Sequence, residues 1–210
     1  IQYVKGNYLM DNILICPEKP GEILKEMITS VNIGGFFKEY YDNYQDLDFR
    51  NKIILFAVEL GDSGVNIELY KLIKRLRTRE EKPMSNSTAG ILVHCNSELY
   101  TRSEARNLIF TCNAIGCYFP GNPLVEATGS LKNFINYEKH FDMTLKEGCL
   151  NSCTELSERL LSFDNTKIKS PKILVLHSSN SETTNTYMLW KLVENNLKNA
   201  VIKEIHIGQE

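Results

Sequence analysis

Short apolar runs alternate with amphipathic segments along most of the chain. The runs are rich in branched residues, which is typical of buried parallel strands. They cover residues 12–16, 36–41, 52–60, 90–95, 117–119 with 124–126, 172–177 and 200–207. Between most of them, apolar residues recur at intervals of three and four, which indicates helices with one buried face. Strands separated by helices predict a parallel sheet with right-handed crossovers.

The order of the predicted elements over roughly residues 12–165 is β-α-β-β-α-β-α-β-α. This order resembles a flavodoxin-like α/β fold, a doubly wound parallel sheet with helices on both faces and strand order 2-1-3-4-5. Its second helix is missing or very short. The fifth strand is interrupted by Pro-Gly-Asn-Pro at residues 120–123. Two Ser/Thr-x-x-Glu patterns, at residues 101–104 and 152–155, predict capping boxes at helix starts.

The C-terminal part of the chain has an extra β-α-β segment. We therefore expect a flavodoxin-like domain at 1–165, followed at 166–210 by a connector and the start of a second such unit. Two parallel strands and one helix cannot bury both faces of a sheet. The segment is thus truncated from a longer tandem protein, completes the first sheet, or is exchanged between subunits. We favour truncation for its origin and expect the segment to dock on the sheet of the first unit.

The loop at residues 178–186 joins the strand and helix of this extra segment. It holds six hydroxyl side chains and two Asn, and no hydrophobic residue. A helix N-terminus has free N–H groups and a partial positive charge, so an anion is its natural ligand. The alternative is a loop that only caps its own helix.

This loop also resembles the phosphate loop of the flavodoxin-like NAD(P)H-dependent FMN reductases, with the pattern G-S-P-R-x-x-G-N-T. When Asn185 and Thr186 are aligned with the motif, Ser179 falls on the motif Ser. Asn180 and Ser181 replace the Pro and the Arg, and losing the Arg removes a bidentate phosphate partner. The residues that the resemblance assigns to FMN phosphate are Ser179, Ser181, Thr184, Asn185 and Thr186.

Topology suggests where the flavin ring would lie, because flavodoxin-like proteins hold it with the loops after the third and fourth strands. Gly61, Asp62 and Ser63 would meet one edge of the ring, and Tyr100 would stack on its face. The resemblance implies an oxidoreductase that passes electrons from NAD(P)H, a transient co-substrate, through FMN to a small-molecule or protein acceptor. It assigns no catalytic residue.

The loop after the first strand favours a second hypothesis. Residues 16–22 contain no hydroxyl side chain, and Glu18 and Glu22 would repel a phosphate. The first unit then is a cofactor-less flavodoxin-like domain that serves as a packing or dimerisation module of a larger protein. Three carboxylates and two histidines near strand ends are further candidates for acid–base catalysis. Their alternative roles are helix capping and core packing. These residues are Glu59, Glu98, Glu126, His94 and His177.

Composition excludes several classes of function. The formal net charge of −2 gives no electrostatic reason to expect nucleic acid or an anionic membrane as partner. No apolar run approaches the roughly 20 residues of a membrane helix, and no signal peptide is evident, so we expect a cytoplasmic protein. The six cysteines form no C-x-x-C pair, which predicts free thiols in apolar surroundings and no metal site.

Overall fold

The computed structural model describes residues 4–5, 8–9, 11–44, 46–79, 81–164, 170–178 and 183–207. Contacts divide the chain into two compact units, Ile1–Asn165 and Thr166–Glu210, called unit 1 and unit 2 here. A membrane-spanning helix, one both long and apolar enough, is not found within these ranges.

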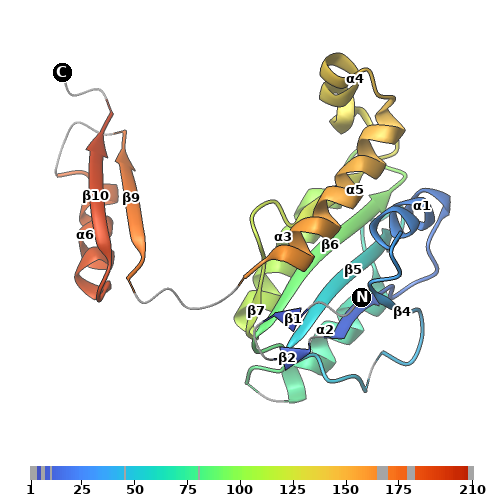
Figure 1. Ribbon diagram of the computed structural model, residues 1–210, viewed down its shortest axis with the longest axis horizontal. Helices are drawn as coiled ribbons and strands as arrows, with labels where there is room; N and C mark the ends of the chain where they lie inside the picture. Colours follow the sequence, from blue (N-terminus) through green and yellow to red (C-terminus); the bar gives the residue numbers. More distant parts are fainter. Residues whose placement is uncertain are drawn as a thin grey trace. The chain divides into compact units, whose positions relative to one another are not determined.

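Unit 1 is built on a parallel sheet with strand order β4-β3-β5-β6-β7 (Figure 1). Its strands are β3 (Asp11–Ile15), β4 (Lys38–Tyr40), β5 (Lys52–Leu60), β6 (Ser87–Cys95), β7 (Cys117–Tyr118) and β8 (Leu124–Ala127). β7 pairs with the start of β6 and β8 with its later part. Together they form one interrupted fifth strand, so the predicted order 2-1-3-4-5 and the interruption are confirmed.

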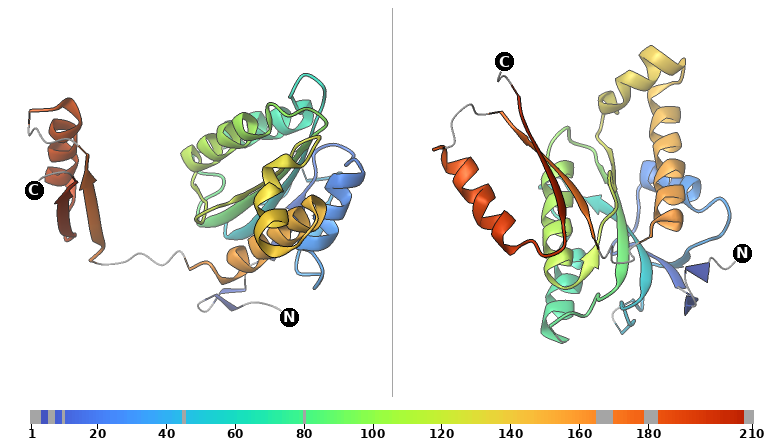
Figure 2. Two further views of the ribbon diagram at one scale, coloured as in Figure 1. Left: turned by 90° about the horizontal axis from the view of Figure 1, so that it is seen from above. Right: turned by 60° about the vertical axis from the view of Figure 1, so that its left-hand side comes forward.

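Helices cover both faces of this sheet (Figure 2). α1 (Glu22–Val31) and α5 (Leu145–Ser162) pack on one face, and α2 (Ile67–Arg79) and α3 (Thr101–Ala114) on the other. The central strand β5 explains why both faces are apolar. Its alternating residues Ile54, Phe56 and Val58 enter the core under α2 and α3, while those between them enter the core under α1 and α5.

The remaining elements of unit 1 are short. β1 (Val4–Lys5) and β2 (Tyr8–Leu9) form an antiparallel pair, and η1 (Lys132–Phe134) with α4 (Ile135–Phe141) leads into α5. Between β4 and β5 the described residues form bends and turns but no helix. The weak or missing second helix that the sequence predicts is therefore confirmed.

Both predicted capping boxes are wrong. α3 starts with Thr101 already inside the helix, and Glu104 turns away to accept a hydrogen bond from the Tyr70 hydroxyl at 2.9 Å. Ser152 lies in the middle of α5, which begins at Leu145 with a capping box of Thr144 and Glu147. The spacing alone could not identify the start, because the same three-residue spacing also occurs inside helices.

Unit 2 consists of β9 (Lys172–His177), α6 (Asn185–Asn196) and β10 (Val201–His206), with the strands parallel. The predicted extra β-α-β segment is confirmed. One sheet face packs on α6, whereas Leu174 and Leu176 on the other face are 58% and 57% exposed. The predicted docking of this segment on the sheet of unit 1 stays a prediction.

Candidate functional site

A carboxylate is bound at the N-terminus of α1, the first helix of unit 1 that could hold an anionic ligand. The helix follows β3 at the carboxyl edge of the sheet, where open α/β sheets bind ligands. Its N-cap is Gly21, whose N–H donates to Oε2 of Glu59 at 2.8 Å. Glu59 comes from the end of β5, and its side chain is only 18% exposed. The protein thus places its own negative charge where a ligand's phosphate would otherwise be stabilised.

The fold holds this carboxylate in place. Glu59 and His94 are register partners on the neighbouring strands β5 and β6, so their side chains leave the sheet on the same face. His94 is buried, and its Nδ1 lies 2.5 Å from Oε1 of Glu59. Both carboxylate oxygens therefore have a partner, and releasing Glu59 would leave buried polar groups unsatisfied.

A second carboxylate fills the start of α2. The Ile67 N–H donates to Oε1 of Glu18 at 3.2 Å. Glu18, which the sequence predicts to repel a phosphate, therefore caps α2 instead.

Cys16 directly follows β3. Burial, assisted by the Glu59 charge, raises the pKa of the Cys16 thiol to about 12. The thiol is thus protonated at neutral pH and is a poor nucleophile.

The structure brings together the residues predicted to meet a flavin ring. Gly61, Asp62 and Ser63 follow β5, and the loop ends at Gly64, whose φ is +73°. A Cβ atom at Gly64 would lie 2.2 Å from Cγ of Tyr100, so the tyrosine side chain packs directly on this loop. Tyr100 has a φ of 77°, which is strained for a residue with a side chain. The contact of these residues with an isoalloxazine ring stays a prediction.

The loops that follow β6 and β8 are tied together by Glu98. Its Oε1 accepts a hydrogen bond from the Ser130 N–H at 2.6 Å, and hydrogen bonds from Ser130 lower the pKa of this carboxyl. Gly129 passes so close that a Cβ atom there would lie 2.1 Å from the Asn96 carbonyl oxygen. Glu98 therefore joins two loops, rather than capping α3 as the sequence suggested.

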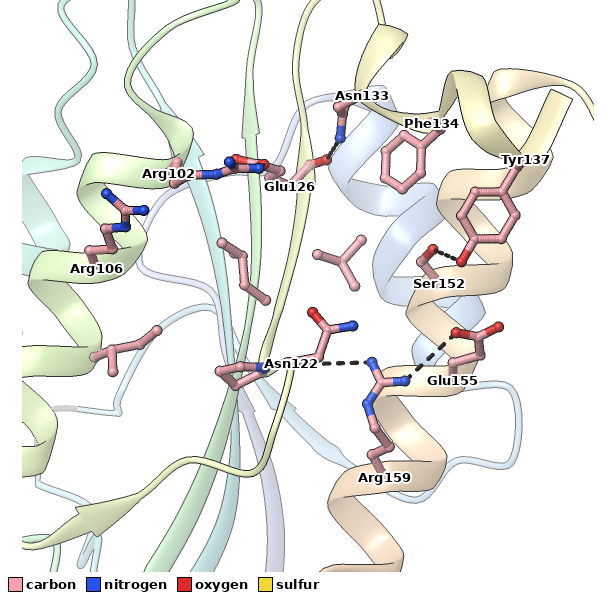
Figure 3. A pocket seen from close by; sticks show the side chains of 14 residues that line it. Arg102, Arg106, Asn122, Glu126, Asn133, Phe134, Tyr137, Ser152, Glu155 and Arg159 are labelled. Carbon is pink, nitrogen blue, oxygen red and sulfur yellow. Dashed lines mark hydrogen bonds and ion pairs between the residues drawn. The ribbon is translucent and has the colours of Figure 1, made fainter. Parts of the chain in front are cut away.

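A long groove runs beside β8, between α3 and the segment from η1 to α5 (Figure 3). It consists of two cavities of about 490 and 480 Å³ that share Arg102, Arg106, Glu126 and Asn133. We call it the arginine groove. Its size falls in the range of small-molecule sites.

Most polar groups of the arginine groove bind one another. The Arg102 guanidinium donates to the Glu126 carboxylate, which is also bonded by the Thr101 hydroxyl at 3.1 Å. Arg159 donates to the Asn122 carbonyl oxygen at 3.3 Å. Arg106 differs, since within the described parts of the chain no carboxylate lies within ion-pair distance of it. The groove could hold a small anion, with Arg106 supplying the free charge.

Sequence reasoning missed the arginine groove although a signal was present. Arg102 and Arg106 are four residues apart on one predicted helix and therefore lie on one face. From the sequence alone, Glu126 is a candidate only as a carboxylate near a strand end. What the sequence could not show is that α3 and the edge strand β8 bring these three groups to one place.

The predicted phosphate loop of unit 2 is described in part. Ser179 and Ser181 lie outside the described residues. Thr184 is the N-cap of α6, and its hydroxyl accepts from the Tyr187 N–H at 3.3 Å, as the capping alternative expects. Asn185 and Thr186 are exposed in the first turn of α6, which contains no acidic residue.

Comparisons with known proteins add little. No family model and no curated protein sequence matches the chain. One solved structure, described as RosB with a bound intermediate, 8-demethyl-8-formylriboflavin-5'-phosphate, aligns over 95% of this chain and 92% of that one. The sequence identity is 12% and the TM-score 0.49. A likeness of this size carries no argument about function, so the flavodoxin-like fold rests on the strand order given above.

Proposed function

We propose that the chain is a flavodoxin-like NAD(P)H-dependent FMN oxidoreductase in which unit 2 binds the FMN phosphate and unit 1 does not. The residues proposed to hold the phosphate are Ser179, Ser181, Thr184, Asn185 and Thr186. Bound FMN would supply the electron transfer between the nicotinamide and an acceptor.

The observation that carries this proposal is the carboxylate at α1. In unit 1 the Gly21 N–H already binds Glu59 at 2.8 Å, and a phosphate there would meet a negative charge held by His94. This arrangement disfavours the FMN phosphate at α1.

The N-terminus of α6 differs from that of α1. Its first turn contains no acidic residue, and Asn185 and Thr186 are exposed there. Thr184 would keep its role as N-cap while the free N–H groups of the first turn face the phosphate. This donor set suits an anion, and the absence of the motif Arg predicts modest affinity.

The test is the absorption spectrum of the 210-residue protein after incubation with FMN and gel filtration. Retained flavin bands support the proposal. Thr186→Val should weaken FMN binding by about 10- to 150-fold, because a hydrogen bond to a charged group contributes about 1.5–3 kcal/mol. The matched control is Thr78→Val on the exposed side of α2, which should leave the affinity unchanged. Equal affinity of Thr186→Val and the original protein would contradict the assigned loop.

A second candidate function is supported by the same carboxylate. If the purified protein retains no flavin, unit 1 is best regarded as a cofactor-less module that packs against or dimerises with another domain. The carboxylates at the starts of α1 and α2 favour this role for unit 1, because each already accepts a hydrogen bond where a ligand's anion would bind. The flavin spectrum separates the two candidates.

A further inference from the structure

Three side chains that can bind metals converge in unit 2. His177 and His206 end the parallel strands β9 and β10 and are register partners. Glu204 lies two residues before His206, so its side chain leaves β10 on the same face. One potential ligand atom from each of the three lies within 4.8 Å of the others.

Hydrogen bonds account for only part of this cluster. Nε2 of His177 lies 2.9 Å from Oε2 of Glu204, and Lys191 Nζ lies 2.8 Å from Oε1 of the same carboxylate. The imidazole rings of His177 and His206 stack with centroids 4.6 Å apart. Nδ1 of His206, however, is buried and has no hydrogen-bond partner among the residues that the structure describes. A buried polar atom without a partner calls for an explanation.

We propose that His177, Glu204 and His206 form a binding site for a divalent transition metal, with Zn²⁺ as the best fit. Two imidazoles and one carboxylate are a known ligand set for zinc, with water at the fourth position. Imidazole also suits Co²⁺ and Ni²⁺, whereas Mg²⁺ and Ca²⁺ prefer sites made of oxygen ligands. The expectation of no metal site rested on the cysteine pattern, whereas two histidines and a glutamate form this cluster.

Small side-chain movements would complete the coordination. Ligands about 2.0–2.1 Å from a tetrahedral zinc ion lie about 3.4 Å apart. The three atoms are now at most 4.8 Å apart, so rotations of the side chains on fixed strands can close the gap. A metal would take the place of the hydrogen bond between His177 and Glu204.

Lys191 competes with a metal at this site. Its ammonium group binds Oε1 of Glu204 and, on its other side, Glu194 at 2.8 Å. The side chain is 39% exposed, so it can turn into solvent when a second cation arrives. Removing this positive charge should therefore raise the affinity for the metal.

The buried pair in unit 1 provides a matched control. His94 and Glu59 form the same kind of contact, at 2.5 Å, on neighbouring strands. Among the described residues, no third metal-ligating side chain joins them. If one His–Glu pair were enough to bind the metal, His94 and Glu59 would bind it too. The proposed site also requires His206.

The experiment is a Co²⁺ titration of the untagged, flavin-free full chain, followed by the visible bands of tetrahedral cobalt. We expect one Co²⁺ per chain, displaced by Zn²⁺. His206→Gln should weaken binding by more than about tenfold, since even the loss of outer partners of metal ligands costs this much. His94→Gln should bind as the original protein does, and Lys191→Met should bind more tightly.

Three results would overturn the proposal. One is the absence of tetrahedral Co²⁺ bands in the original protein, and another is unchanged binding by His206→Gln. Weaker binding by Lys191→Met would show that the metal does not compete with the ammonium group for Glu204. The fluorescence of Trp190 checks that unit 2 stays folded, and the isosteric Glu204→Gln replaces His206→Gln if that variant unfolds. Because no flavin is present, failure here leaves the FMN proposal untouched.

Discussion

Units 1 and 2 begin with the same local pattern, an apolar parallel strand followed by a loop and an amphipathic helix, yet their strands differ in burial. In β3, Leu14 and Ile15 are fully buried. In β9, Leu174 and Leu176 alternate with less exposed neighbours and remain more than half exposed. The difference lies in the number of layers, because β3 has helices on both faces of its sheet whereas β9 has only α6. An apolar run thus predicts a strand but not how many faces of it are covered.

The helix that follows each strand shows a second difference. At α1 a carboxylate from another strand occupies the N-terminus, while the cap of α6 comes from its own Thr184. A ligand at α1 would have to displace Glu59 from His94 and Gly21. A ligand at α6 would meet no acidic residue in the first turn.

The largest expected effect comes from matched leucines in the two strands. Leu14→Ala should destabilise unit 1 by about 3 kcal/mol, the usual cost of truncating a fully buried leucine. Leu174→Ala should cost less than about 1 kcal/mol, because this side chain is already 58% exposed. Urea unfolding is followed by far-UV circular dichroism, to which both units contribute, and by Trp190 fluorescence, which reports on unit 2. Equal costs would mean that another surface covers Leu174.

A smaller effect is expected from the carboxylate at α1. Glu59→Gln keeps the shape of the side chain but removes the charge that Gly21 and His94 bind. We expect a loss of about 1–2 kcal/mol in the free energy of unfolding, measured in urea at neutral pH. Glu158→Gln, on the exposed side of α5, is the control and should change stability by less than about 0.5 kcal/mol. Unchanged stability of Glu59→Gln would show that this carboxylate does not hold the start of α1.

The smallest effect concerns pH and contrasts a carboxyl group in each unit. The hydrogen bond from Lys191 is the main reason that the pKa of Glu204 falls to about 2, whereas burial raises the pKa of Glu104. An unfolded Glu titrates near about 4.3. The contribution of Glu204 to stability is thus fully present above that pH and is lost as the pH falls through about 2. Glu104 behaves oppositely, stabilising below about pH 4.3 and losing this contribution as the pH rises through its higher folded pKa.

This pH dependence is measured by comparing the original protein with Glu204→Gln in metal-free buffer. The difference in unfolding free energy, followed by Trp190 fluorescence, should be largest near pH 7 and shrink as the pH falls from about 4.3 to about 2. A difference that is the same at both ends of this range would show that the ionised carboxylate is not what stabilises the cluster.

Much of the fold could be predicted from the sequence because its signals are local. The apolar run at 52–60 and the spacing of apolar residues in α1 and α3 depend only on the geometry of strands and helices, and both helices bury the predicted faces. Helix starts were harder, as Thr101 and Ser152 illustrate. Each has a Glu three residues later, but Glu104 binds Tyr70 instead and Ser152 lies inside a longer helix.

The sequence by itself determined the order of strands and helices, the weak second helix and the interrupted fifth strand, since periodicity and turn residues carry that information. Only the tertiary structure decided which polar groups meet. Glu59 and Gly21 are far apart in the chain, and parallel pairing of β3 with β5 brings them within 2.8 Å. Likewise, His177 meets His206 through the register of β9 and β10. Contacts between distant residues depend on sheet register and layer packing, which no local pattern specifies.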